Sequence, residues 1–551
     1  MVRTELIRPL AELLKQQAHR LGDKIAFRDP TREVSYAELE RRTSRIAGHL
    51  VAHGVQRGDR IVISLGNRVE TLEAYYAVNR AGAVGVPVDP RAATPELAYL
   101  LDDSGATAVL TDRAHVDRIL ELAAERALPT TIVVVGDDAV PAPLLRFEDL
   151  ATIDPVVPAR DDLGLDETAW ILYTSGTTGR PKGVVSTQRN CLWSVAACYA
   201  PVLGLSEQDY VLWPMPLFHS LAHVLCVHGV VATGATVRIT PGFAADDVLD
   251  LVAREPFTFL VGVPTMFHHL LRAADGAQSV VPSLRMCLVT GAVATAALKE
   301  SFETAFAVPL VDSYGSTETS GAITMNHPDG PLVAGSCGLP VPGLDVRVVD
   351  PQTGVDVATG EPGEVWVGGP NPMRGYHRQP VATASALRDG WYRTGDLARR
   401  DAQGYLTICG RIKELVIRGG ENIQPAEIED VIRDVPGVAD VAVAGRPHEV
   451  LGEVPAAYVV PDAGGPLDVE AIFAACRLHL AHHKVPEEVY EIEAIPRTAS
   501  GKISRLALAS RPARLVATLA ARNEWLFRVD RQPWSAMPAA PLGTCAVVGD
   551  D

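Results

Sequence analysis

Two hydrophobic periods alternate along the first 160 residues, and this alternation constrains the fold more than any other feature. Segments with apolar residues at helical spacing, such as residues 10–21 and 36–53, are followed by short runs rich in Val and Ile, such as residues 60–65 and 131–135. This alternation is typical of parallel βαβ units, in which each crossover helix covers one face of a sheet. The sequence therefore predicts an α/β fold.

The pattern changes twice farther along the chain. From about residue 335, short strands bounded by Gly and Pro indicate a β-rich subdomain, and a compact mixture of helices and strands follows Gly410. A chain of 551 residues is also too long for one hydrophobic core. We therefore expect an N-terminal core over residues 1–411, which includes the β-rich subdomain at about 335–410, and a small α+β domain over residues 412–510.

Charge and composition exclude several classes of protein. The net charge of −17 repels phosphate backbones and anionic headgroups, and the eight cysteines include no C-x-x-C pair of the kind found in metal sites. The N-terminus lacks the apolar run of a signal peptide, and the longest apolar stretch, residues 221–235, contains His223 and His228 and is too short to span a membrane. We expect a cytoplasmic protein that binds neither nucleic acid nor membrane.

One loop has the composition of a phosphate cradle. Residues 173–183 read Tyr-Thr-Ser-Gly-Thr-Thr-Gly-Arg-Pro-Lys-Gly and follow a strand-like run. Glycines let backbone N–H groups approach an anion, hydroxyl groups donate hydrogen bonds, and Lys182 supplies positive charge. Lys182 is followed by Gly183, so the string is not a Walker A loop. The alternative interpretation is an ordinary hairpin rich in Gly and Thr.

Four further strings are less specific when each is taken alone. Residues 312–318 offer a tyrosine for stacking on a base and a Thr-Glu pair for a phosphate oxygen and Mg²⁺, and residues 392–396 end in a carboxylate that suits ribose hydroxyls. Residues 410–423 combine charges with paired glycines, as in a hinge, and residues 496–502 present one lysine. Each string has an ordinary alternative, such as a surface turn or a solvated lysine.

Together, the five strings resemble the adenylate-forming superfamily, which includes acyl- and aryl-CoA ligases, adenylation domains of nonribosomal peptide synthetases and beetle luciferases. The resemblance covers about residues 10–505. It implies a large N-terminal domain of two αβ layers with a β-barrel-like subdomain, followed by a small, mobile α+β C-terminal lid. The nucleotide-binding residues that it implies are Thr174, Ser175, Gly176, Thr177, Thr178, Gly179, Lys182, Gly291, Ala292, Ser313, Tyr314, Gly315, Thr317, Asp396 and Arg411.

The resemblance also implies the reaction. A carboxylate attacks the α-phosphate of ATP to give acyl-AMP and pyrophosphate, and a thiol then displaces AMP to give a thioester. Glu318 is the implied Mg²⁺ ligand and Lys413 the hinge, and the implied catalytic residues are Lys502, Thr178, Glu318 and His219. Lys502 is expected to act in the first half-reaction only, because rotation about the hinge removes it before the thiol enters.

A third set of residues is implied to form the acid pocket: His219, Val263, Thr265, Met266, Ala292, Thr319, Ser320 and Gly321. Amino-acid-activating relatives carry an aspartate where this chain has His219, and an imidazole supplies no counter-charge for a substrate ammonium group. We therefore predict a non-amino carboxylic acid of the aryl, alicyclic or medium-chain acyl class.

The acceptor thiol remains open between coenzyme A and the phosphopantetheine of an acyl carrier domain. Residues 506–524 are predicted to form an amphipathic helix, and the tail beyond them resembles the beginning of the structural half of a ketoreductase domain in modular polyketide synthases. That resemblance implies that residues 511–551 are a linker and the truncated start of a further domain, after a CoA-ligase-like loading domain of the rapamycin or FK506 type. The alternatives are a free-standing acyl- or aryl-CoA ligase and a catalytically silent nucleotide-binding module.

Overall fold

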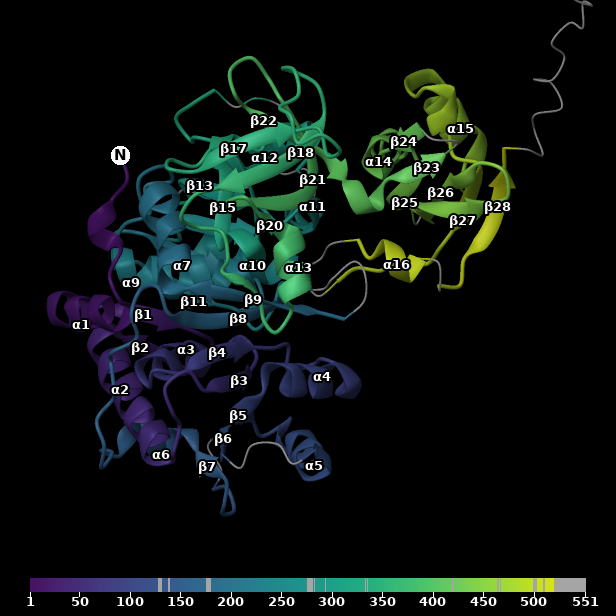
Figure 1. Cartoon of the computed structure of the whole chain (residues 1–551). Coiled ribbons are helices and arrows are strands. Elements are labelled where there is room, and N and C mark those ends of the chain that lie inside the picture. The colour runs from purple at the N-terminus through teal and green to yellow at the C-terminus, as the bar shows by residue number, and fades with distance from the viewer. Residues whose placement is uncertain are drawn as a thin grey trace, which may run out of the picture. The chain divides into compact units, whose positions relative to one another are not determined.

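The chain forms two compact units in the computed structural model (Figure 1). The large unit comprises Met1–Lys413 and Arg497–Ser504, and the small unit comprises Glu414–Pro496 and the residues from Arg505 onward. The predicted domain boundaries and the hinge role of Lys413 stay predictions. The structure describes residues 1–126, 131–136, 139–174, 180–274, 281, 283–292, 294–331, 333, 335–418, 421–462, 465, 467–498, 503–508 and 511–519.

The first sheet of the large unit contains eight strands in the order β19-β9-β8-β4-β3-β5-β6-β7. The strands from β8 to β7 in this order are parallel, whereas β9 and β19 are antiparallel to their neighbours. The strands are β3 (Arg60–Ser64), β4 (Val84–Pro87), β5 (Ala106–Asp112), β6 (Thr131–Val135), β7 (Leu145–Arg146), β8 (Thr168–Thr174), β9 (Lys182–Thr187) and β19 (Gly375–Tyr376). Their helices are α3 (Val69–Arg80), α4 (Thr94–Ser104), α5 (Val116–Arg126) and α6 (Phe147–Thr152).

The second sheet has nine strands in the order β16-β15-β14-β13-β12-β10-β11-β1-β2 and is parallel from β14 to β1. The strands are β1 (Ile25–Arg28), β2 (Glu33–Ser35), β10 (Tyr210–Trp213), β11 (Thr236–Ile239), β12 (Phe259–Gly262), β13 (Met286–Val289), β14 (Leu310–Ser316), β15 (Gly321–Met325) and β16 (Leu339–Pro340). The helices around it are η1 (Thr4–Leu6), α1 (Leu10–Leu21), α2 (Tyr36–Ala52), α7 (Gln188–Ser194), η2 (Val195–Tyr199), α10 (Ala245–Arg254), α11 (Pro264–Ala273), α12 (Ala296–Phe306) and η4 (Thr317–Thr319).

Both sheets have hydrophobic cores on their two faces, which explains why their strands read as continuous apolar runs. In β3, Ile61 and Ile63 belong to one buried cluster, and Val62, which lies between them, belongs to another. In β13, the neighbouring residues Leu288 and Cys287 likewise belong to two different buried clusters. Parallel strands with helices on both faces are buried in this manner. The predicted α/β fold is confirmed.

A third, antiparallel sheet completes the large unit where the Gly- and Pro-bounded pattern predicts strands. Its order is β17-β18-β21-β20, with β22 paired to β21. The elements are β17 (Asp345–Val349), β18 (Gly363–Gly368), α13 (Pro380–Ala386), β20 (Leu387–Arg388), β21 (Trp391–Arg400) and β22 (Leu406–Arg411), and η5 (Ile412–Glu414) follows.

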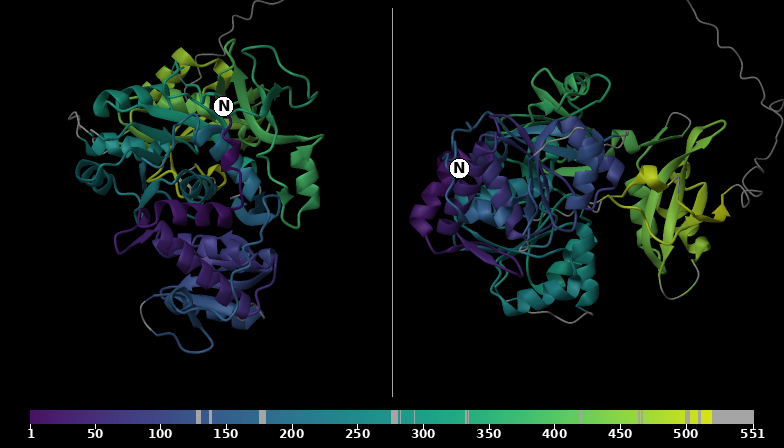
Figure 2. Two further views of the ribbon diagram at one scale, coloured as in Figure 1. Left: turned by 90° about the vertical axis from the view of Figure 1, so that its left-hand side faces the viewer. Right: turned by 90° about the horizontal axis from the view of Figure 1, so that it is seen from below.

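The small unit is an α+β fold around a six-stranded sheet, seen in green to yellow in the right-hand view of Figure 2. The strands are β23 (Val416–Arg418), β24 (Glu421–Ile423), β25 (Val438–His448), β26 (Gly452–Pro461), β27 (Glu488–Glu491) and β28 (Arg514–Thr518). The helices are α14 (Pro425–Arg433), α15 (Val469–His479), η6 (His482–Lys484) and α16 (Arg505–Leu508), and the core includes Ile428, Ile432, Val459 and Phe473.

The predicted helix over residues 506–524 is wrong for its central part. Residues Arg514–Thr518 instead form β28, an edge strand antiparallel to β27, and Leu519 is buried in the core of the small unit. Pro512 has no backbone N–H to donate and interrupts a helix at this point. The open edge of β27 then offers hydrogen bonds that the local periodicity does not reveal.

The longest apolar stretch lies inside the core of the large unit. It forms α8 (Ser220–Ala222), the π-helix η3 (His223–Gly229) and α9 (Val230–Thr233). His223 and His228 are fully buried, and burial lowers the pKa of His228 to about 4, so this imidazole is neutral at physiological pH. None of the helices within the described residues combines the length and hydropathy needed to cross a bilayer.

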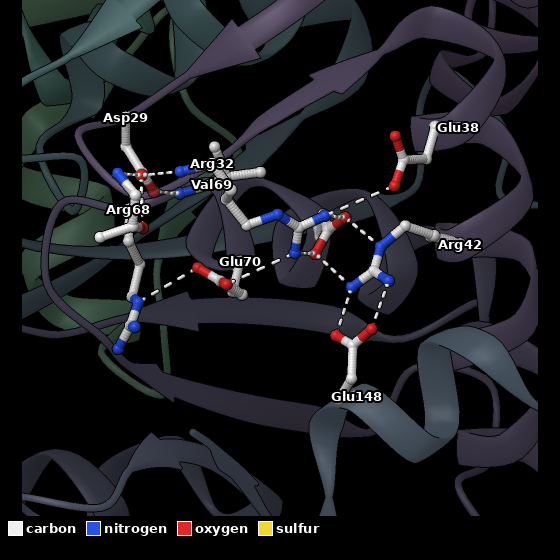
Figure 3. Close-up of polar contacts among 10 residues, drawn as sticks. Asp29, Arg32, Glu38, Arg42, Arg68, Val69, Glu70 and Glu148 are labelled. Atoms are coloured by element: carbon white, nitrogen blue, oxygen red, sulfur yellow. Dashed lines mark hydrogen bonds and ion pairs between the residues drawn. The ribbon is translucent and has the colours of Figure 1, made fainter. Parts of the chain in front are cut away.

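A buried ion network ties α2 to α3 and α6 (Figure 3). Glu73 of α3 is fully buried and accepts hydrogen bonds from Arg42 at 2.6 Å and from Arg32 at 3.3 Å. Arg42 also donates two bonds to Glu148, at 2.8 and 2.9 Å. Burial opposes the charge of Arg42, but its bonds to Glu148 and Glu73 outweigh this effect and raise the pKa of Arg42.

We expect Arg42→Ala to lower the free energy of unfolding of the large unit by about 3–5 kcal/mol, because it leaves a buried carboxylate with one weaker partner. The matched control is Arg254→Ala. Its partner Asp250 lies 2.9 Å away, but both side chains are mostly exposed, so the expected loss is below about 1 kcal/mol. Denaturant titration measures both values, and equal losses would contradict the role of the network.

Candidate functional site

The predicted phosphate loop connects two antiparallel strands. Thr174 at the end of β8 faces Lys182 at the start of β9, and the Thr174 hydroxyl donates to the Lys182 carbonyl at 3.4 Å. Ser175, Gly176, Thr177, Thr178 and Gly179 lie outside the described residues, so their roles stay predictions. The two ends of a hydroxyl-rich loop are therefore held together beside one lysine.

A tyrosine joins this lysine to the predicted magnesium ligand. The Lys182 ammonium lies 5.0 Å from the centre of the Tyr376 ring, and the Tyr376 hydroxyl donates to Glu318 Oε1 at 3.0 Å. Burial and the neighbouring Glu318 carboxylate raise the pKa of Tyr376, so the phenol remains a neutral donor. β19 pairs with β9 and brings Tyr376 to this place. No local pattern in the sequence identifies Tyr376, because its neighbours come from distant segments.

The donor set around Glu318 fits a magnesium ion that is shared with phosphate oxygens. Magnesium usually takes one or two carboxylates, and water and phosphate oxygens complete its shell. Among the described residues, no group of three or more His, Cys, Asp or Glu side chains can hold a metal. The single Glu318 carboxylate, which accepts a bond from the Tyr376 hydroxyl, would therefore hold a magnesium ion only together with water and phosphate oxygens.

Asp396, the predicted ribose ligand, is fixed from both sides. The Tyr314 hydroxyl donates to Asp396 Oδ2 at 2.6 Å, and Arg411 Nε lies 2.6 Å from Oδ1. Burial and the Asp396 carboxylate raise the pKa of Tyr314, which keeps this hydroxyl a donor. The Asp396 side chain is only 4% exposed. A carboxylate is a hydrogen-bond acceptor, so this fixed side chain is suited to the hydroxyl groups of a ribose.

The predicted adenine contacts come from the ends of neighbouring parallel strands. Gly291 and Ala292 follow β13, Ser313 lies in β14, and the Thr290 hydroxyl donates to the Ser313 carbonyl at 3.1 Å. Gly315 has a steric reason to be glycine, since a Cβ there would lie 2.2 Å from the carbonyl oxygen of Gly321. This close approach shapes the turn between β14 and β15, which carries Thr317 and Glu318.

The predicted acid-pocket residues come from several segments of the large unit. His219 precedes α8 and stacks on Phe218, with ring centroids 5.3 Å apart, and Ser220 accepts a bond from the Thr317 hydroxyl at 3.1 Å. Val263 follows β12 and approaches Gly291, while Thr265 and Met266 begin α11.

Two predicted pocket residues use their side chains within the protein. The buried Thr319 hydroxyl lies within hydrogen-bonding distance of the Ser316 and Gly321 carbonyls, which share its one proton, and the buried Ser320 hydroxyl contacts Ser186. Ser320 has a φ of +46° and Gly321 a φ of +120°. Thr319 and Ser320 therefore shape the turn, and their side chains do not present free polar groups.

In the small unit, Arg505 is held by two carboxylates. Lys502 itself lies outside the described residues. Arg505, three residues later, pairs with Glu414 at 3.2 Å and with Glu429 at 3.0 Å. The predicted hinge residue Lys413 lies in η5 and is exposed.

Comparison with known proteins identifies two matching family models. One is described as AMP-binding enzyme and matches residues 14–377, and the other is described as AMP-binding enzyme C-terminal domain and matches residues 427–502. Among solved structures, ATP-bound MatB from Rhodopseudomonas palustris is 34% identical with a TM-score of 0.83, and the match covers 91% of this chain and 98% of MatB.

Proteins of similar sequence differ greatly in length. Naringenin synthase of Pestalotiopsis fici is 40% identical over 517 residues, and this chain spans only 19% of its length. Feruloyl-CoA synthase of an Amycolatopsis species is 37% identical over 473 residues, which are 85% of this chain and 92% of that enzyme. Because one family model covers more than half of the chain and these enzymes match it along most of its length, the chain belongs to the AMP-binding enzyme family.

Proposed function

We propose that this chain uses ATP and Mg²⁺ to convert a non-amino carboxylic acid into acyl-AMP and then passes the acyl group to a thiol. The observation that supports this most directly is the Asp396 carboxylate, which Tyr314 and Arg411 hold in place as an acceptor for ribose hydroxyls. The Lys182, Tyr376 and Glu318 cluster supplies the second polar centre, suited to a triphosphate.

The chemistry needs positioning and charge more than a protein nucleophile. Attack of a carboxylate on the α-phosphate brings two anions together, so fixed cations and donors lower the barrier. Lys182 and the loop after Thr174 would bind the triphosphate, Asp396 would orient the ribose, and Lys502 would bridge the two reacting anions. A magnesium ion held by Glu318 would neutralise phosphate charge.

An aryl acid is the substrate class that we favour. His219 offers no counter-charge for an ammonium group, and Val263 and Met266 are apolar. The name of the relative feruloyl-CoA synthase, which matches along 92% of its length, supports an aromatic acid. Alicyclic and medium-chain acids are the competing classes.

For the acceptor, we propose the phosphopantetheine of an acyl carrier domain in a polyketide synthase. The similarity to the much longer naringenin synthase supports this assignment, because the match occupies only 19% of a larger polypeptide. Free coenzyme A is the alternative acceptor, supported by the nearly full-length match to feruloyl-CoA synthase. The predicted start of a further domain after residue 511 stays a prediction.

The function is tested by incubating the protein with ATP, Mg²⁺ and a panel of aryl, alicyclic and medium-chain acids. We expect acid-dependent pyrophosphate exchange and AMP formation, strongest with an aryl acid. Addition of CoA or of a phosphopantetheinylated carrier domain then separates the acceptors, and acylation of the carrier is expected. Efficient CoA thioester formation without carrier acylation would favour the free-standing ligase, and no AMP with any acid would favour the silent module.

Lys502→Ala is expected to separate the two half-reactions. Loss of one donor to developing charge slows a reaction by about 10²–10³-fold. We therefore expect adenylation to slow by this factor, while thioester formation from supplied acyl-AMP stays nearly intact. Lys484→Ala is the control, because this lysine pairs with Glu427 within the small unit. An equal loss in both half-reactions would refute the role of Lys502.

Asp396→Asn and Tyr314→Phe test the ribose contact. The asparagine has a donor where the carboxylate accepts, so it loses charge-assisted bonds worth about 1.5–3 kcal/mol, or roughly 10–100-fold in the KM for ATP. Tyr314→Phe keeps the ring and removes one brace of Asp396, so a smaller rise in the same direction is expected. Steady-state kinetics with ATP and acid varied separately measure both, and a change confined to the acid KM would contradict the assignment.

A further inference from the structure

The segment that leads to His219 is buried, irregular and bounded by prolines. Pro214 and Pro216 have no N–H group to donate, yet Met215 and Leu217 are 6% and 1% exposed. Buried backbone groups outside helices and sheets must find other hydrogen-bond partners. The backbone of residues 215–217 therefore depends on side chains from elsewhere in the large unit.

One side chain, Asn67, supplies most of these partners. It lies in the turn between β3 and α3, at the carboxyl end of a strand in the first sheet. Its Nδ2 donates to the carbonyls of Met215 at 2.8 Å and Thr240 at 3.0 Å, and its Oδ1 accepts from the Leu217 N–H at 2.8 Å. Carbonyls only accept and an N–H only donates, so these partners allow a single orientation of the amide.

A second anchor holds the same peptide from α3. The Tyr75 hydroxyl donates to the Leu217 carbonyl at 3.1 Å, and Tyr75 is 1% exposed. The backbone N–H and carbonyl of Leu217 are therefore both bonded to side chains of the β3–α3 unit, which belongs to the first sheet. Leu217 itself follows β10 of the second sheet.

From Leu217, the chain reaches the site within three residues. His219 directly precedes α8, its carbonyl accepts from the Ala222 N–H at 3.0 Å, and Ser220 is bonded to Thr317. The segment is thus held at one end by Asn67 and at the other by the turn that carries Thr317 and Glu318. A shift at Leu217 would move His219 and Ser220 relative to that turn.

We propose that Asn67 is a positioning residue that sets the place of His219, and through it the fit of the carboxylic acid, without touching substrate. The expected effect on the kinetics of acid activation rests on the proposed function. ATP binding should be insensitive to Asn67, because its hydrogen-bond partners, Met215, Leu217 and Thr240, are not among the predicted nucleotide residues.

Asn67→Ala removes all three bonds, and Tyr75→Phe removes one. The matched control is Asn79→Ala, because Asn79 lies at the other end of α3 and also donates to two carbonyls, those of Ala83 and Ala169, without contacting residues 215–220. The readouts are the KM and kcat for acid and for ATP in pyrophosphate exchange, together with hydrogen–deuterium exchange of residues 214–220 in the ligand-free chain.

We expect Asn67→Ala to reduce kcat/KM for the acid by roughly 10–100-fold, as when a reacting group is displaced by about 1 Å, with the KM for ATP unchanged. Tyr75→Phe should give a smaller change in the same direction, and both variants should speed exchange at Leu217. Asn79→Ala should destabilise the chain but leave kcat/KM for the acid and hydrogen–deuterium exchange at Leu217 unchanged.

The proposal would be overturned if Asn67→Ala changed kcat/KM equally for acid and for ATP, or if Asn79→Ala produced the same kinetic change. Unaltered hydrogen–deuterium exchange at Leu217 would also overturn it. If the unmodified chain makes no AMP with any acid, the proposed function fails. Hydrogen–deuterium exchange then still decides whether Asn67 holds this segment. Exchange at Leu217 is faster in Asn67→Ala if it does, and unchanged if it does not.

Discussion

The bond from the Tyr314 hydroxyl to Asp396 joins the second sheet of the large unit to the third, and the site depends on bonds of this kind. Tyr376 to Glu318 joins the first sheet to the second in the same way. Parallel strands place polar residues at one edge of a sheet but do not fix edges of different sheets to each other. Buried side-chain hydrogen bonds between sheets therefore set the relative positions of the predicted nucleotide-binding groups.

The local parts of the fold and of the site were predictable from sequence, and their long-range partners were not. The helix Leu10–Leu21 and the strand Thr131–Val135 agree with their periodicity, because burial on a helix stripe or a sheet leaves a local pattern. β28 and Tyr376 were missed, since each takes its place by pairing with a distant strand edge. Asn67 was missed for the same reason, because its three partners follow it by about 150 residues or more.

The acidic net charge does not conflict with an anionic nucleotide. Charges farther away than about 8 Å are largely screened at physiological ionic strength. Near the predicted site, the Lys182 ammonium lies over the Tyr376 ring and Arg411 pairs with the Asp396 carboxylate. Such nearby cations act on an anion at short range, where they are screened less than the distant surface charges.

The predicted acid-binding and nucleotide-binding groups are built on different structural supports. Asp396 and Glu318 are fixed by hydroxyl donors on strands, whereas His219 follows an irregular segment that contains Pro214 and Pro216. Asn67 and Tyr75 hold the backbone of this segment at Leu217 from outside. If His219 lines the acid pocket as predicted, we expect substitutions on this segment to alter the acid pocket without loosening the predicted nucleotide site, provided that the two anchoring side chains are kept.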